Sequence, residues 1–230
     1  MKVLDVMTRR VIAIAPEATI RDAVRLMLTH HISGLPVIDA KGELVGVVSE
    51  GDFLRRSETA TERRHSRWFD AFFGPAESAE AFVHAHGTHV RDVMTRKPVT
   101  IAETAPLEDA VHLMETHNIK RLPVLRRDKV VGILTRANLM RALASVHRGA
   151  GAVAKQDEAI REGILADVAR QSWAAGATID VIVRNGIADI WGCIVDAAQR
   201  DAVKVLVEST PGVKRAYDHL ACREEPAAVT

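Results

Sequence analysis

The sequence predicts a mixed α/β fold of the α+β type, with two copies of a βαββα unit followed by a smaller αββαβ unit. Three features support this: an internal repeat, apolar residues that alternate between short strand-like runs and helical stripes, and a hairpin signal near the C-terminus. Residues 3–40 match residues 90–127 at 20 of 38 positions. Because two copies are too few for a solenoid, we expect two similar units packed face to face about a pseudo-twofold axis, with equivalent clefts between them.

The bulk composition is that of a folded protein. Of its 230 residues, 47% are hydrophobic and 27% are charged, which allows real cores and excludes a disordered chain. The net charge of +1 and the 4% aromatic content give no case for nucleic acid binding. Two cysteines provide no disulfide framework, and the first ten residues lack the apolar run of a signal peptide. We therefore expect a cytoplasmic protein.

The first unit is expected over residues 1–56. Pro16 ends its first strand, and Thr19, with Asp22 three residues later, forms a capping box for the helix that follows. Pro36 lacks an N–H, so its strand should lie at an edge or be irregular. The expected elements are a strand at 11–14, a helix at 20–30, strands at 34–38 and 44–48, and a helix that opens at 49–52.

The second unit, expected over residues 90–148, repeats this order after a single deletion at Gly42. Its helix has the same stripe of apolar residues at helical spacing. The expected elements are a strand at 99–102, a helix at 107–117, strands at 122–125 and 130–134, and a helix from 135 towards 146.

An insert at residues 57–89 separates the copies and is too long for a simple loop. Its Trp68, Phe69, Phe72 and Phe73 have the spacing of an amphipathic helix. That helix is expected to pack on the repeats or at a dimer seam; the alternative is a membrane-surface or partner-binding helix. Three nearby histidines at 84, 86 and 89 lack a recognised ligand pattern, so no metal site is predicted.

The C-terminal part is expected to consist of a linker at 149–156, a small domain at 157–223 and a tail at 224–230. Asn185-Gly186 is the strongest hairpin signal in the chain. Gly192 lies inside the second strand, where glycine indicates a bulge or a close backbone approach. The elements are a helix at 157–169, strands at 177–183 and 187–195, a helix at 197–208 and a strand at 213–220.

The two repeats resemble the cystathionine β-synthase (CBS) domain, and together a tandem CBS pair, or Bateman module. The motifs are DVMT before the first strand, GLPV and RLPV after the helix, and GVVSEGD and GILTRAN at the end. The resemblance implies that the pair binds adenine nucleotides in its clefts and regulates rather than catalyses. The implied ligand is AMP, ADP or ATP, with NAD and S-adenosylmethionine as further candidates, and the implied assembly is a homodimer through the pair.

The polar residues that the resemblance assigns to the ligand stand where a strand passes into a helix. Ser49 and Asp52 would contact phosphate and ribose in the first copy, and Thr135 and Asn138 in the second. Asn138 departs from the family pattern, since an amide oxygen accepts more weakly than a carboxylate. Ser-x-x-Asp is also a capping box, so the residues alone leave a structural role open.

The resemblance also assigns strand residues to the adenine, and basic residues nearby suit phosphate oxygens. The adenine set is Val11, Ile12, Gly34, Leu35 and Pro36 in the first copy, and Val99, Thr100, Arg121, Leu122 and Pro123 in the second. The basic residues near the expected clefts are Arg9, Arg10, Arg96, Lys97, Lys120, Arg121 and Arg136; each is alternatively a solvated surface residue.

The C-terminal domain resembles the BON domain, through Gly186, Gly192 and the closing Pro211-Gly212-Val213. This implies attachment to a membrane phospholipid or to a protein partner, although each glycine also has a structural explanation. The sequence shows no nucleophile elbow, P-loop or metal box, so no catalytic site and no required cofactor are predicted. Two functions result: a nucleotide-sensing regulator, or alternatively a structural adaptor that uses the BON domain and the insert.

Overall fold

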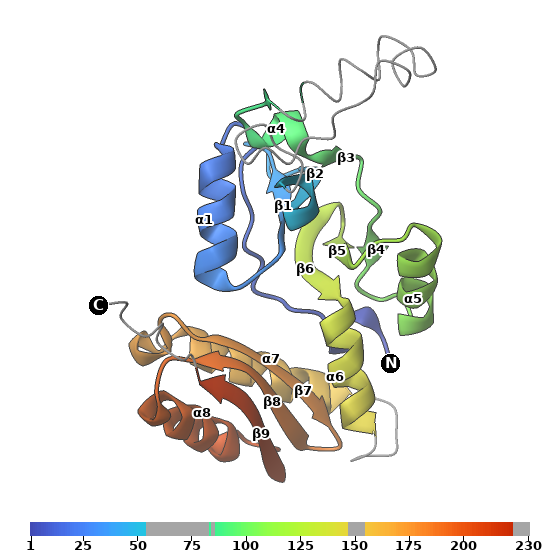
Figure 1. The fold of residues 1–230 in the computed structure, drawn as a ribbon. Coiled ribbons are helices and arrows are strands. Elements are labelled where there is room, and N and C mark those ends of the chain that lie inside the picture. The colour runs from blue at the N-terminus through green and yellow to red at the C-terminus, as the bar shows by residue number, and fades with distance from the viewer. Residues whose placement is uncertain (54–82, 84–85, 147–154, 223–230) are drawn as a thin grey trace, which may run out of the picture. The chain divides into compact units, whose positions relative to one another are not determined.

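The computed structural model describes residues 1–53, 83, 86–146 and 155–222 (Figure 1). The chain forms two compact units. The first-repeat unit contains Arg10–Ile101 and Leu125–Val131, and the second-repeat unit contains Met1–Arg9, Ala102–Val124 and Gly132–Thr230. The predicted insert helix and the histidine at 84 lie outside the described residues, so those two expectations stay predictions.

The described part is a mixed α and β structure with three three-stranded sheets, ordered β1-β2-β3, β4-β5-β6 and β7-β8-β9. The helices are η1 (Val3–Asp5), α1 (Ile20–His30), α2 (Glu50–Phe53), α4 (Val90–Val93), α5 (Leu107–Thr116), α6 (Arg136–Val146), α7 (Lys155–Ala169), η3 (Ser172–Ala174) and α8 (Ala197–Ser209). The strands are β1 (Gly34–Ile38), β2 (Leu44–Ser49), β3 (Thr95–Arg96), β4 (Ile101–Ala102), β5 (Arg121–Arg126), β6 (Lys129–Thr135), β7 (Thr178–Arg184), β8 (Ile187–Ile194) and β9 (Arg215–Cys222).

Helix α1 begins and ends where the sequence predicts. The Thr19 hydroxyl accepts from the Asp22 N–H, and the Asp22 carboxylate accepts from Thr19, which closes the capping box. The hydrogen bonds from Thr19 lower the pKa of Asp22. His31 ends the helix in the left-handed conformation, with φ of 51°. The buried face of α1, Ala23 and Met27, joins a core with β1 and β2.

The prediction of a first strand at residues 11–14 is wrong. Only Ile14 pairs, in a single parallel bridge to Val37, where its N–H donates to the Pro36 carbonyl and its carbonyl accepts from Ile38. The next step of a parallel ladder needs an N–H on Pro36, which proline lacks, so the pairing stops. Pro36 itself lies in an edge strand, as predicted, with a register shift between Val37 and Ile38.

The expected strand at 99–102 is shortened in the same way, to β4. Pro123 in β5 stands at the repeat-equivalent position of Pro36. The remaining expected strands and helices of both repeats are present and shift by at most a residue or two at their ends.

The segment that leads into each repeat pairs with the hairpin of the other repeat. Thr8 forms a bridge with Ile133 of β6, and the Met7 side chain packs against Gly132. In the other unit, β3 pairs with β2, and the Met94 side chain packs against Gly46. The two repeats therefore exchange equivalent segments, which explains why Met1–Arg9 belongs to the same compact unit as the second repeat.

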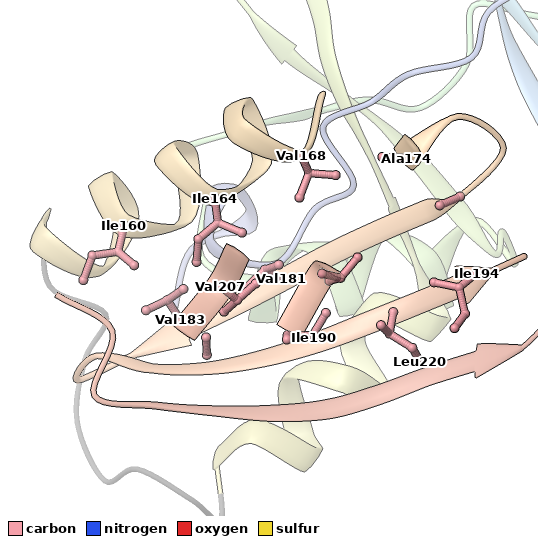
Figure 2. Close-up of a cluster of buried hydrophobic side chains, with 13 residues drawn as sticks. Ile160, Ile164, Val168, Ala174, Val181, Val183, Ile190, Ile194, Val207 and Leu220 are labelled. Atoms are coloured by element: carbon pink, nitrogen blue, oxygen red, sulfur yellow. The ribbon is translucent and has the colours of Figure 1, made fainter. Parts of the chain in front are cut away.

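The third sheet and its helices form the αββαβ domain. Strand β8 pairs antiparallel with β7 and parallel with β9. Its core brings together apolar side chains of α7, α8 and all three strands, so both helices cover the same face of the sheet (Figure 2). Buried residues of this core include Ile164, Val181, Ile190 and Val207.

The two glycines singled out in this domain have structural reasons. Asn185 and Gly186 both have positive φ, at 51° and 76°, as a tight hairpin turn requires. The Asp157 carboxylate at the start of α7 accepts from both of their N–H groups. Gly192 has φ of 143°, and a Cβ there would lie 1.8 Å from the Thr178 carbonyl oxygen. It is thus a close backbone approach, one of the two predicted alternatives.

Candidate binding sites at the strand-to-helix turns

The first candidate site lies where β2 passes into α2. Ser49 ends β2 opposite Gly34 of β1, and the Glu50 N–H donates to the Ser33 carbonyl, which fixes the turn. The Asp52 carboxylate accepts from the Ser49 N–H at 2.7 Å and from the Ser49 hydroxyl at 3.0 Å. These are capping contacts. The structure thus brings Gly34, Ser49 and Asp52 together, with Ser49 and Asp52 half-buried.

The adenine set of the first repeat is placed partly in the core. The Leu35 side chain is fully buried in the cluster with α1, and Pro36 is buried beside it. Val11 and Ile12 are half-buried, and Ile12 packs against the same cluster. In this set, Leu35 and Pro36 can therefore offer a ligand their backbone more readily than their side chains.

Two further expected site residues belong to the same compact unit. Val99 and Thr100 are half-buried and directly precede β4. Arg96 and Lys97 are exposed, and Arg96 stands opposite Gly46, three positions before Ser49 on β2. A guanidinium group of Arg96 donates to the Arg91 carbonyl at 3.3 Å. This unit thus carries exposed basic groups on and directly after β3, the strand next to β2.

The second candidate site, where β6 passes into α6, repeats the capping geometry with an amide. The Asn138 side-chain oxygen accepts from the Thr135 N–H at 2.9 Å and from the Thr135 hydroxyl at 2.6 Å. Its side-chain nitrogen donates to the Val6 carbonyl at 3.0 Å and to the Thr8 hydroxyl at 3.1 Å. Asn138 is only 2% exposed. Both the oxygen and the nitrogen of the Asn138 amide are therefore hydrogen-bonded within the protein.

The other expected residues of the second site differ in exposure. Leu122 and Pro123 are buried and Arg121 is half-buried. Arg136 is exposed, and its guanidinium donates to the Ile119 carbonyl at 3.4 Å. Arg9, which we expected near a cleft, forms an ion pair with Glu162 of α7 at 2.6 Å.

Sequence reasoning missed a buried charged cluster beside Asn138. The Arg161 guanidinium donates to the Leu4 carbonyl at 2.6 Å, the Met7 carbonyl at 2.7 Å, Asp180 Oδ1 at 2.9 Å and the Val181 carbonyl. Burial lowers the pKa of Arg161, an effect that Asp180 opposes. One signal was visible: an arginine directly follows Ile160 in the apolar face of α7, and an aspartate interrupts the apolar run of β7.

Within the described ranges, no group of three or more His, Cys, Asp or Glu side chains is placed to hold a metal ion. In the same residues, no helix combines the length and the apolar character that crossing a bilayer requires.

Comparison with known proteins identifies the family. The CBS domain model matches residues 3–59 and 90–145, and the BON domain model matches residues 156–224. Protein MJ1426 of Methanocaldococcus jannaschii is 34% identical over 154 residues, which cover 62% of this chain and 91% of that protein. The chain belongs to the CBS-domain family, as a pair of CBS repeats followed by a BON domain.

A second relative has a solved structure with a ligand. The chloroplastic CBS domain-containing protein CBSX2 of Arabidopsis thaliana is 34% identical over 141 residues, which span 59% of this chain and 59% of that protein. The crystal structure of CBSX2 in complex with AMP superimposes with a TM-score of 0.56, over 64% of this chain and 98% of that one.

Proposed function

We propose that the protein is a regulatory sensor that binds an adenine nucleotide at the first CBS repeat, beside Ser49 and Asp52. The observation that carries the proposal is the half-buried Asp52 carboxylate at the β2–α2 turn, in a family of which one member was crystallised with AMP. A carboxylate is an acceptor with about four positions, a chemistry that suits contact with ribose hydroxyls.

The surrounding groups fit the parts of a nucleotide. The half-buried side chains of Val11 and Ile12 offer apolar surface to an adenine ring, and the backbone of Gly34, Leu35 and Pro36 offers it hydrogen-bonding groups. Exposed Arg96 on β3, the strand beside β2, and exposed Lys97 directly after it provide cations for phosphate. The preferred ligands are AMP, ADP and ATP; NAD and S-adenosylmethionine extend the same adenosine moiety.

For the second repeat we propose a weaker position for the same ligand class. Thr135 and Asn138 replace Ser49 and Asp52, and the amide oxygen of Asn138 already accepts two bonds from Thr135. The associated residues are Val99, Thr100, Arg121, Leu122, Pro123 and Arg136. Regulation rather than catalysis, a homodimer through the CBS pair, a cytoplasmic location, and attachment to a phospholipid or protein through the BON domain stay predictions.

Calorimetric titration with AMP, ADP, ATP, NAD and S-adenosylmethionine tests the proposal. We expect Asp52→Ala to weaken AMP binding at least tenfold, because a hydrogen bond to a charged group contributes about 1.5–3 kcal/mol. The matched control is Asp22→Ala, which removes an equivalent capping carboxylate from α1. AMP at 100 times its Kd should add about 2.7 kcal/mol to the free energy of unfolding.

Two outcomes contradict the proposal. One is no heat and no thermal shift with any of the five ligands. The other is equal loss of AMP affinity in Asp52→Ala and Asp22→Ala, which would assign Asp52 a capping role alone. Flotation of the protein with liposomes, without nucleotide binding, would instead support the adaptor function.

A further inference from the structure

The internal repeat allows the two ligand positions to be compared residue by residue. Asp52 corresponds to Asn138, Thr95 to Thr8 and Arg96 to Arg9. In the first-repeat unit, Thr95 and Arg96 are exposed and Asp52 is half-buried. Their counterparts in the second-repeat unit are largely covered: Asn138 is 2% exposed and the Arg9 side chain 21%. The two positions therefore differ in what surrounds them, although the backbone pattern is repeated.

The groups that cover the second position belong to the BON domain. Asp180 Oδ2 on β7 accepts from the Thr8 hydroxyl at 3.3 Å and lies 3.5 Å from the Asn138 amide nitrogen. Arg141 of α6 lies 3.8 Å from the same carboxylate oxygen and over the ring of Trp191 on β8. The BON domain thus brings a carboxylate to the place where the second repeat lacks one.

A second set of contacts ties the BON domain to Met1–Arg9, the lead-in segment that pairs with the second repeat. Arg161 of α7 binds the Leu4 and Met7 carbonyls, and Glu162 of the same helix pairs with Arg9. Arg161 also donates to the Val181 carbonyl, and the Val181 N–H donates to Asp180 Oδ1. Arg161 and Asp180, which both contact the lead-in segment, therefore also bond the backbone carbonyl and N–H of Val181 on the edge strand β7.

From these contacts we infer that the second CBS position is the docking site of the chain's own BON domain, which competes there with nucleotide. The inference rests on the proposed function for its ligand and on the structure for its partner. While the BON domain is docked, Asn138, Thr8 and Arg9 are all engaged, so the chain binds one nucleotide, at the first repeat. Occupation of the second position requires release of the BON domain and thereby couples ligand to domain arrangement.

Asparagine at position 138 is the residue type that docking requires. Its amide nitrogen donates to the Val6 carbonyl and faces Asp180. A carboxylate at position 138 would turn an acceptor towards that carbonyl and place two buried negative charges side by side, which is strongly unfavourable. Asn138→Asp, which recreates the first repeat's residue, should therefore release the BON domain. Asn138→Asp/Asp180→Asn returns one carboxylate and one amide to the cluster and so removes the charge repulsion. It leaves a carboxylate facing the Val6 carbonyl and Arg161 without its nearest anion, so it should restore docking in part.

Hydrogen–deuterium exchange of the full chain tests docking without any ligand. We expect exchange in segments 1–9 and 178–184 to be at least tenfold faster in Asn138→Asp than in wild type, and measurably slowed again in the double variant. Asp52→Asn, the equivalent change in the first repeat, is the matched control and should leave both segments unchanged. Segment 197–209, which is α8, reports whether the BON domain itself remains folded.

Three exchange results would overturn the inference: unchanged segments in Asn138→Asp, equal acceleration in Asp52→Asn, or no recovery in the double variant. Recovery in the double variant is decisive even where Asn138→Asp alone destabilises the BON domain.

Calorimetric titration with AMP measures how many nucleotides each chain binds and so tests the competition. We expect one AMP per wild-type chain and two per Asn138→Asp chain. Two AMP per wild-type chain with segments 1–9 and 178–184 still protected would overturn the competition. If no variant binds AMP, the proposed function fails, whereas the exchange experiment still decides whether the BON domain docks at the second position.

Discussion

No residue with a side chain fits at position 192 in β8. With φ of 143°, its backbone is in a region that L-residues rarely adopt, and the Thr178 carbonyl oxygen occupies the place of a Cβ. Since the obstacle is backbone of the paired strand, it has no flexible side-chain end that could move aside. The glycine that the BON resemblance includes is therefore fully accounted for by folding.

We expect Gly192→Ala to lower the free energy of unfolding by about 3 kcal/mol or more, the range of severe core overpacking. Urea denaturation measures it. The matched control is Gly163→Ala in α7, where a Cβ meets nothing within 4 Å; this change should be neutral or stabilise the helix by up to about 1 kcal/mol. Similar losses in both variants would refute the steric explanation.

Residues with local chemistry were the most predictable part of the sequence. The Thr19 and Asp22 capping box and the Asn185-Gly186 turn act between near neighbours, so spacing alone identifies them. Ser49 with Asp52 and Thr135 with Asn138 were likewise predicted as pairs, and both pairs are formed. Arg161 and Asp180 were missed because Arg161 donates to carbonyls more than 150 positions away in the sequence. Its other acceptors lie on β7, and residue spacing does not encode how that strand is oriented towards α7.

Among the secondary-structure elements, the exchange of lead-in segments organises both repeats. Gly132 in β6 and Gly46 in β2 stand at equivalent positions, and each accommodates the methionine of an incoming segment. A Cβ at Gly132 would lie 2.5 Å from the Met7 sulfur and 3.1 Å from the Thr8 carbonyl oxygen. Small residues on the receiving strands thus allow the segments to approach closely.

The close approach of the Met7 side chain to Gly132 leaves no room for a methyl group. Gly132→Ala should lower the free energy of unfolding by about 1–3 kcal/mol, because the fully buried Met7 must move. A double-mutant cycle with Met7→Ala separates packing from strand propensity. We expect the two changes together to cost less than the sum of the single changes, by more than about 0.5 kcal/mol. Additive costs would show that Gly132 matters for another reason.

The strand boundaries show what element-level patterns omit. The apolar run at 11–14 predicted a strand, yet only Ile14 pairs, since Pro36 cannot donate to the next step of the ladder. Both the run and the proline were visible in the sequence. What was missing was the parallel register that sets one against the other, which depends on the fold of the whole repeat.

For the whole molecule, the buried Arg161 of the BON domain connects that domain to the N-terminal segment. Its four acceptors come from residues 4, 7, 180 and 181. Arg9 and Glu162 link the same parts at the surface, with Glu162 54% exposed. Both are ion pairs or charge-assisted contacts, yet burial should make their energetic roles very different.

We expect Arg161→Ala to lower the free energy of unfolding by about 3–5 kcal/mol, because it leaves the buried Asp180 with only the more distant Arg141 as a cation and removes the donor from three carbonyls. Glu162→Ala should cost at most about 1 kcal/mol, because its pair with Arg9 is open to solvent. Urea denaturation at low salt and at about 1 M salt separates the two roles further. Salt at that concentration shortens the Debye length to about 3 Å, so the effect of Glu162→Ala should vanish while that of Arg161→Ala persists. Equal salt sensitivity, or a cost for Arg161→Ala below that for Glu162→Ala, would show that the BON domain is not held to the N-terminal segment through this guanidinium.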